Sequence, residues 1–168
     1  MIETVGEERA VVIGLGEMHV TRDPAALLVC FGIGSCLAFS AFDAASKVAG
    51  MAHFVLPDSA GGIRARTPER FVDAGIPLLL QRLEAAGAER GRTIFRMAGG
   101  AHMVLARGFE SKLNIGARNI ATARATLAEL RLRVRGEDVG GQHGRTVRMF
   151  AATGRVTVST VGGVSYEL

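Results

Sequence analysis

Short apolar runs bounded by turn residues dominate the first third of the chain, and this pattern is typical of buried β-strands. The runs lie at residues 10–13, 26–31, 36–42 and 48–56, and residues 18–22 predict an edge strand. Gly32-Ile33-Gly34 separates two of the runs. We therefore expect a tight glycine turn that makes the flanking strands neighbours.

Two helices are predicted in the rest of the chain. Thr67-Pro68-Glu69 supplies an N-cap, a proline at the first helical position and an early acid, which together indicate a helix start. Apolar residues follow at helical spacing until Gly87, and we expect Pro77 to kink or split this helix. A second helix is predicted from about Gly116 to Leu130, with its apolar residues on one face.

The remaining runs complete an α/β pattern. Strands are predicted at residues 93–97 and 132–136, a loop at 137–141, and a hairpin joining 147–151 to 156–161. Because the connections are short, the sheets should be mostly antiparallel. The chain of 168 residues suits one domain, and we predict a layered sandwich of mixed, mostly antiparallel β-sheets with helices packed outside.

One stretch raises the question of a membrane span. Residues 24–42 carry no charge, and 18 or more such residues can form a membrane-spanning helix. Gly32 and Gly34 would interrupt that helix, and the flanks are rich in strand formers. We predict two buried strands and no membrane insertion. Residues 1–9 are polar and acidic and lack the pattern of a secretory signal, so a cytoplasmic location is expected.

Composition excludes several other classes. Two cysteines cannot form a disulfide framework, and no Cys/His spacing suits a structural zinc site, so neither metal nor cofactor is expected. The net charge of +4 comes almost entirely from arginine. With no Trp and one Tyr to stack on bases, nucleic-acid binding is not expected. Arg131, Arg133 and Arg135 alternate, and we interpret them as a solvated strand face.

The candidate chemistry lies around the first glycine turn. If residues 36–42 and 48–54 form a hairpin that turns through residues 43–46, Phe42 faces Lys47 and Cys36 faces His53. Directly opposite side chains have Cβ atoms roughly 4.5–5.5 Å apart. An imidazole at that distance can take a thiol proton, which is the minimum equipment for a cysteine nucleophile.

The same reasoning brings the two cysteines together. A three-residue turn at residues 32–34 would place Cys30 opposite Cys36. Gly34 and Ser35 precede Cys36, and a backbone without a Cβ lets a substrate approach while N–H groups turn toward a developing oxyanion. The competing interpretation is plain packing, because free cysteine is among the most buried residue types.

A family resemblance bears on that choice. Gly32-Ile33-Gly34-Ser35-Cys36, followed by residues 52–57 (Ala-His-Phe-Val-Leu-Pro), resembles the chemoreceptor glutamine deamidase family, CheD. The resemblance continues through residues 99–101, 115–119, 137–141 and 144–145. It runs in order from about Gly14 to Val161, so residues 1–168 are expected to form a single CheD-like domain.

The resemblance implies a cytoplasmic chemotaxis enzyme that converts glutamine side chains of methyl-accepting chemoreceptors to glutamate. It implies a fold like that of the cytotoxic deamidase toxins, with Cys36 as nucleophile, His53 as base and a thioester intermediate. The receptors' cytoplasmic domains would be its partners. The alternative is a weakly active or inactive adaptor that binds a CheC-type response-regulator phosphatase. A papain-like peptidase is less well supported, because that class's local cysteine motif is not found.

The chain departs from the family at one site position. Where the family has a threonine six residues before the nucleophile, this chain has Cys30. A thiol is a weak donor and a weak acceptor, so Cys30 should orient His53 less firmly. Three outcomes are open: reduced activity, an orienting group from elsewhere, or a scaffold without catalysis. A Cys30–Cys36 disulfide as an off state is opposed by the reducing cytosol.

The other polar residues are assigned structural roles. His19, His102 and His143 are interpreted as solvated or packed. Gly14-Leu15-Gly16 is too short for a dinucleotide-binding loop. A last group within the family-like motifs, expected to set turn geometry and helix-end hydrogen bonds, comprises Arg118, Asn119, Asp138, Gly140 and Gly141.

Overall fold

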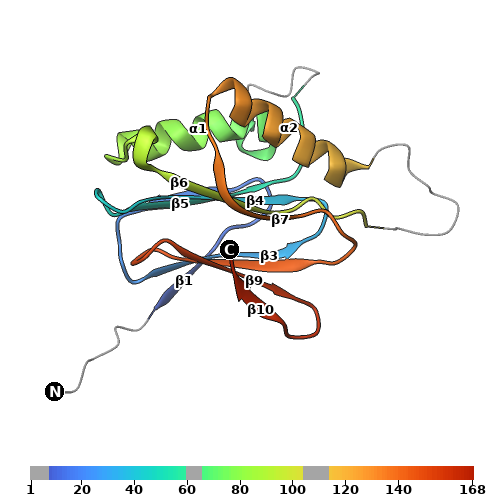
Figure 1. Ribbon diagram of the computed structural model, residues 1–168. Coiled ribbons are helices and arrows are strands. Elements are labelled where there is room, and N and C mark those ends of the chain that lie inside the picture. The colour runs from blue at the N-terminus through green and yellow to red at the C-terminus, as the bar shows by residue number, and fades with distance from the viewer. Residues whose placement is uncertain (1–7, 60–65, 104–113) are drawn as a thin grey trace, which may run out of the picture.

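The chain folds into three layers (Figure 1). The computed structural model describes residues 8–59, 66–103 and 114–168. Helices α1 (Val72–Ala85) and α2 (Ile115–Glu129) cover one face of a five-stranded sheet, and a second five-stranded sheet packs against its other face. None of the helices in these ranges is both long and apolar enough to cross a membrane.

The two sheets are mixed and mostly antiparallel, which confirms the predicted fold class. The helix-covered sheet has the order β2 (Met18–Thr21), β5 (Val48–Phe54), β4 (Leu37–Asp43), β6 (Ile94–Gly99), β7 (Val134–Val139). The second has the order β1 (Arg9–Val12), β3 (Ala26–Ile33), β8 (Arg145–Phe150), β9 (Arg155–Thr160), β10 (Ser165–Glu167). Among the paired strands of the described residues, β1–β3 and β6–β7 are parallel.

Strands β4 and β5 are buried along their whole length. One face of each packs under the helices in a cluster that includes Phe39, Phe54 and Leu79. The other face packs against the second sheet, where Met51 and Met149 belong to a separate cluster. Because both faces are covered, the two strands are nearly all apolar, which is the pattern that made them predictable.

The predicted hairpin across the first glycine turn is wrong. Strand β3 belongs to the second sheet and β4 to the helix-covered sheet, so residues 34–36 cross from one sheet to the other. Cys30 pairs with Val147 of β8 rather than with Cys36. An irregularity between Cys30 and Ile33, with Gly32 at φ 62°, turns the chain away from its ladder. A run of apolar residues cannot distinguish such a crossover from a hairpin.

The β4–β5 hairpin exists, but the predicted register is wrong by two residues. Asp43 pairs with Val48, so the turn comprises residues 44–47 and His53 faces Ala38 instead of Cys36. The fully buried Asp43 carboxylate accepts hydrogen bonds from Arg92 at 2.8 and 3.0 Å and from the Glu89 N–H at 2.9 Å. These partners keep Asp43 at the end of the strand rather than in the turn.

Helix α2 lies where it was predicted, but α1 begins later than expected. Residues Pro68–Arg70 form a single 3-10 turn, and Phe71 is extended and bridges to Leu56. The Val72 N–H donates to the Leu56 carbonyl at 2.9 Å, so the helix begins only there. It continues through Pro77, and the predicted split is therefore wrong.

Three smaller differences occur elsewhere. Strand β7 extends to Val139, so most of the loop predicted at residues 137–141 is strand. A second 3-10 turn, Arg90–Arg92, precedes β6. The short strand β10 was not predicted. The β8–β9 hairpin and the position of β2 at a sheet edge are confirmed.

Candidate active site

Cys36 lies in the crossover, one residue before β4 begins, and its side chain is half-buried. The three carbonyls of this crossover are all bound from inside the protein. The Ala101 N–H donates to the Gly34 carbonyl at 2.8 Å, and the Gly100 N–H donates to the Cys36 carbonyl at 2.7 Å. Asn119 Nδ2 donates to the Ser35 carbonyl at 2.8 Å. The nucleophile segment is thus fixed by residues at least 64 positions away in sequence.

The direction of these carbonyls also fixes the N–H groups. In a trans peptide the C=O and N–H point to opposite sides. With its carbonyls turned inward, the segment turns the N–H groups of Ser35 and Cys36 the other way. Within the described part of the chain, neither group donates to a backbone carbonyl. The backbone N–H of Cys36 lowers the pKa of that residue's thiol, although burial raises it more.

Two glycines make the close contact around this segment feasible. A Cβ on Gly99, which has φ 123°, would lie 2.2 Å from the Cys36 carbonyl oxygen. A Cβ on Gly116, in the first turn of α2, would lie 2.3 Å from the Ala101 carbonyl oxygen. The sequence assigns no separate role to these two glycines, which allow three chain segments to meet behind Cys36.

Asn119 joins the nucleophile segment to the strand that carries His53. It is fully buried, and its Nδ2 donates both to the Ser35 carbonyl and to the Val55 carbonyl, the latter at 3.2 Å. Its Oδ1 has no partner among the described residues. An unpaired buried acceptor such as this Oδ1 costs free energy. The two hydrogen bonds that Nδ2 donates to the carbonyls outweigh that cost. Asn119 was predicted to serve a helix end, but its contacts lie in the site.

His53 is held by the loop between β1 and β2. Its Nδ1 lies 3.2 Å from the Ile13 carbonyl oxygen. Its backbone N–H donates to the Glu17 carbonyl and its own carbonyl accepts from the Gly16 N–H, both at 2.9 Å. A carbonyl oxygen can only accept, so Nδ1 carries the proton and Nε2 carries the lone pair. Nε2 is buried and has no partner among the described residues.

The glycine loop set aside as unrelated to function therefore holds the candidate base. Gly16 has φ 71°, and a Cβ there would lie 2.5 Å from Arg70 Cγ. Arg70 in turn is near enough to Cys36 to lower the pKa of the thiol by its charge. Sequence reasoning missed the roles of Ile13 and Arg70. A backbone carbonyl is common to every residue type, so Ile13 offered no signal.

Cys36 and His53 are diagonal neighbours rather than directly opposite. A register displaced by two residues keeps the same face of the sheet, because side chains alternate with a period of two. Diagonal partners have Cβ atoms roughly 7–8 Å apart, a spacing that side chains of this length can bridge. The corrected register therefore keeps Cys36 and His53 as candidates for a pair, at a longer separation than predicted.

Burial sets the protonation of both groups. Burial raises the pKa of the Cys36 thiol above its usual value, although its own N–H and Arg70 act in the opposite direction. Burial lowers the pKa of His53, against the hydrogen bond to Ile13 and the charge of Glu17, which raise it. At neutral pH the pair is therefore a neutral thiol and a neutral imidazole, so a thiolate must be generated by proton transfer.

Cys30 is fully buried beneath the crossover. Burial, with a smaller contribution from the charge of Cys36, raises the pKa of Cys30 to about 12, so it is a neutral thiol. Cys30 and Cys36 are not in the predicted hairpin pairing, because Cys30 pairs with Val147. Both are free thiols. The group on His53 Nδ1 is the Ile13 carbonyl and not the Cys30 thiol.

The remaining motif residues tie the two sheets together beside the site. Arg145 on β8 is buried and binds the Asp138 carboxylate of β7 through two hydrogen bonds, at 2.9 and 3.0 Å. This contact holds the pKa of Asp138 below its usual range. Arg145 also donates to the Gly140 carbonyl at 2.9 Å, and the Gly140 N–H donates to Gly99. The network supports the Gly99 turn from behind.

Comparison with known proteins identifies the family of the chain. The family model described as CheD chemotactic sensory transduction matches residues 55–160. A protein named probable chemoreceptor glutamine deamidase CheD from Symbiobacterium thermophilum is 42% identical over 165 residues, covering 98% of this chain and all of the relative. The chain belongs to the CheD family. The match to the family model begins two residues after His53, but this relative covers both Cys36 and His53.

Two further CheD relatives align with this chain over nearly their full length. Proteins named chemoreceptor glutamine deamidase CheD from Thermotoga maritima and Halalkalibacterium halodurans are 39% and 38% identical to this chain. The alignments cover 90% of this chain in both cases, and 92% and 93% of the relatives. Among the described residues of this CheD-family chain, no three His, Cys, Asp or Glu side chains are grouped as a metal site would require.

Proposed function

We propose that this protein deamidates glutamine side chains of chemoreceptors to glutamate, with Cys36 as nucleophile and His53 as general base. The observation that carries the proposal is the state of His53: its Nδ1 proton is committed to the Ile13 carbonyl, and its buried Nε2 is unpartnered within the described ranges. A neutral imidazole with a free Nε2 lone pair is the form that takes a thiol proton. The names of the relatives support the choice of substrate.

The proposed reaction is acyl transfer in two halves. His53 Nε2 takes the Cys36 proton, and the sulfur attacks the carbon of the substrate carboxamide. The tetrahedral intermediate collapses as the C–N bond breaks, and the nitrogen leaves as ammonia with the proton from Nε2. Water then attacks the thioester carbon and gives its proton to Nε2, the C–S bond breaks, and Nε2 returns the proton to the leaving thiolate. The net change consumes one water and releases ammonia and glutamate.

The backbone of the crossover would stabilise the oxyanion. The N–H groups of Ser35 and Cys36 face away from the inward carbonyls, and neither donates to a backbone carbonyl within the described ranges. Preorganised donors of this kind lower the barrier because they need no rearrangement when the charge develops. Gly34 precedes them and presents no side chain to an approaching substrate.

The pKa directions fit proton transfer within the pair. The thiolate is disfavoured in the resting site, because burial raises the pKa of Cys36. Proton transfer to His53 would create two opposite charges together, which stabilise each other in a partly buried site. Catalysis would then depend on the distance between Sγ and Nε2 when the substrate is bound, and not on a preformed thiolate.

The test is mass spectrometry of a chemoreceptor cytoplasmic fragment incubated with the protein. Conversion of a glutamine to glutamate adds about one dalton and creates one negative charge. We expect conversion by the unaltered protein and none by Cys36→Ala. The matched control is Cys30→Ala, which removes the other thiol. Conversion that survives in Cys36→Ala would refute the proposal.

The adaptor role makes a different prediction for the same variants. A protein that serves mainly to bind a CheC-type phosphatase would show no conversion, and its binding to the phosphatase would be the same with and without the Cys36 thiol. The deamidase proposal implies receptors as partners and a cytoplasmic location, where their signalling domains lie. We favour it, because the contacts of residues 13–17, 99–101 and 119 all converge on Cys36 and His53.

A further inference from the structure

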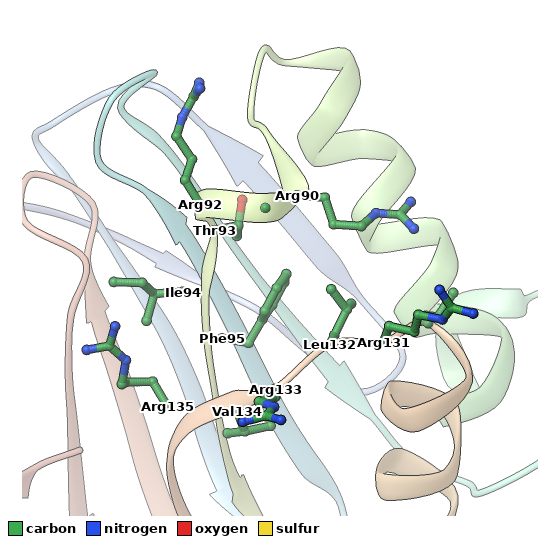
Figure 2. Close-up of a pocket in the computed structure, with 12 residues that line it drawn as sticks. Arg90, Arg92, Thr93, Ile94, Phe95, Arg131, Leu132, Arg133, Val134 and Arg135 are labelled. Carbon is green, nitrogen blue, oxygen red and sulfur yellow. The ribbon is translucent and has the colours of Figure 1, made fainter.

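A groove of about 780 Å³ lies at the end of the helix-covered sheet opposite Cys36. It is formed by the 3-10 turn before β6, the start of β6, and the chain that joins α2 to β7 (Figure 2). Phe95, Ile94 and Leu132 form its apolar centre, and no acidic residue lines it. Five arginines also line it: Arg90, Arg92, Arg131, Arg133 and Arg135.

Three of these arginines are unpaired among the described residues. Arg90 binds Glu84, and Arg92 binds Asp43 and Glu89. No ion pair or hydrogen bond from the side chains of Arg131, Arg133 or Arg135 occurs within the described ranges, and all three are exposed. Uncompensated charge around an apolar centre is unlike an ordinary solvated face, in which charges of both signs alternate.

The backbone at Arg131 supplies a second observation. Helix α2 ends in a Schellman motif, in which the Leu132 N–H donates to the Leu127 carbonyl and the Arg131 N–H to the Ala128 carbonyl. The residue at this position of the motif is usually glycine, because it adopts a left-handed conformation. Here it is Arg131, with φ 56°. Helix stability does not explain an arginine at this left-handed position. The place of its side chain on the groove does explain it.

The shape of the groove limits what can bind. Figure 2 shows the guanidinium groups of Arg92, Arg131 and Arg135 pointing in different directions around Phe95 and Leu132. Several diverging arginines cannot converge on one compact anion such as phosphate. A partner with an apolar side chain at the centre and carboxylates spread around it would contact all of them. No exposed aromatic residue lines the groove to stack on bases, which disfavours nucleic acid.

We propose that this groove is a docking site for an acidic, amphipathic helical segment of the chemoreceptor substrate, distant from the glutamine that reacts. The inference rests on the proposed function for the identity of the partner. Strand β6 connects the two sites, because its first residue, Ile94, lies in the groove and its last, Gly99, pairs with Leu37 beside Cys36. Six residues of strand span roughly 20 Å, which a helix covers in roughly 13 residues.

The docking site would act before the deamidation reaction begins. Charges at the rim of an interface mainly raise the association rate and orient the partner, and salt weakens their effect. An elongated acidic substrate would be captured at the groove and held with its glutamine near Cys36. A short peptide carrying only the glutamine would lack this contact. Selection of the receptor would therefore depend on the groove at one end of β6 and on the Cys36 site at the other.

The test measures binding of a chemoreceptor cytoplasmic fragment to Cys36→Ala protein by isothermal titration calorimetry, at low and physiological salt. In that background, Arg133→Gln with Arg135→Gln should weaken binding about five- to tenfold at low salt and flatten the salt dependence. The matched control is Arg22→Gln with Arg155→Gln, which removes the same charge outside the groove and should leave the affinity within about twofold.

Arg131→Gly separates docking from folding. Glycine suits φ 56°, so the thermal midpoint should stay the same or rise while the fragment binds more weakly. Equal binding by the parent, the double variant and Arg131→Gly would overturn the proposal, as would an equal loss in the control. Tighter binding of an oligonucleotide, lost in the same variants, would assign the groove to nucleic acid instead. Because conversion is not measured here, failure of the deamidase proposal would be recognised separately.

Discussion

His53 lies inside strand β5, whereas Cys36 lies in a crossover one residue before β4 begins. Hydrogen bonds of the sheet and of the loop at residues 13–17 position the histidine. The cysteine depends on contacts from the Gly99 turn and from Asn119 on α2. The proposed base therefore belongs to regular structure, and the proposed nucleophile belongs to a junction of distant segments. Damage to that junction should reduce activity more than it reduces stability.

The largest effect is expected from Gly99→Ala. The new Cβ would lie 2.2 Å from the Cys36 carbonyl oxygen, at φ 123°. Backbone strain and overlap together should lower the free energy of unfolding by about 3 kcal/mol and displace the nucleophile, with a loss of kcat/KM of at least about 100-fold. Urea denaturation and a deamidation assay measure the two quantities.

Gly140→Ala is the matched control for that variant. Gly140 also has positive φ, 81°, but nothing lies within 4 Å of the position of its Cβ. Only the backbone strain should remain, about 1 kcal/mol, with kcat/KM nearly unchanged. Equal effects of the two substitutions would show that contact with the Cys36 carbonyl does not position the nucleophile.

Asn119→Ala should come next. It removes the donor shared by the Ser35 and Val55 carbonyls, and we expect kcat/KM to fall about 10- to 100-fold and the free energy of unfolding by about 2 kcal/mol. Thr126→Ala truncates another buried polar residue of α2 that donates to neither carbonyl. It should cost stability while kcat/KM stays within about twofold. A loss of stability without loss of kcat/KM in Asn119→Ala would contradict a positioning role.

Much of the fold could be predicted because its strands and helices carry local patterns. The two buried central strands, the second helix and the β8–β9 hairpin all lie close to their predicted positions. Register was not predictable, because the end of β4 is held by Arg92, 49 residues further along the chain. The crossover was missed for a related reason: an apolar run shows that a strand is buried, but not which sheet it joins.

The site was predictable only in part. Cys36 and His53 followed from their residue types and the family resemblance, and they stay on one face of the sheet despite the wrong register. The role of Asn119 had a usable sequence signal, because a polar side chain lies on the apolar face of α2, four residues before Ala123. The contact between Ile13 and His53 had no such sequence signal, since it is made by the backbone of Ile13.

The pH dependence of kcat/KM tests the protonation state of His53. His53 must be neutral to take a proton, and burial lowers its pKa below the ordinary 6.5. We expect the acid limb of kcat/KM to have its midpoint below pH 6.5. Because the folded pKa lies below the unfolded one, the contribution of His53 to stability is complete above pH 6.5 and is lost as the pH falls from there toward the folded pKa.

Glu17→Gln should shift that limb by a fraction of a pH unit. The Glu17 charge raises the pKa of His53, so its removal should lower the pKa further and move the limb to more acidic pH. Gln keeps an oxygen that can accept from the Gly14 N–H, as Glu17 does at 2.8 Å. Glu137→Gln, on the surface beside Arg124, is the control and should shift nothing. A shift toward alkaline pH would contradict the assignment.

The smallest effect is expected from Cys30→Thr, which introduces the threonine that the family resemblance implies at this position. Cys30 would matter to catalysis if it oriented His53, but Nδ1 of that histidine is bound to the Ile13 carbonyl. The buried thiol, with a pKa of about 12, is a packing group against Val147 on this account. We therefore expect kcat/KM of Cys30→Thr to stay within about threefold of the parent, and the same for Cys30→Ala, with stability changes of about 1–2 kcal/mol from altered packing. A tenfold gain in Cys30→Thr that is absent in Cys30→Ala would mean that a hydroxyl here orients the base. The histidine would then depend on the crossover side of the site as well as on its own strand, and the two halves of the pair would not be held independently.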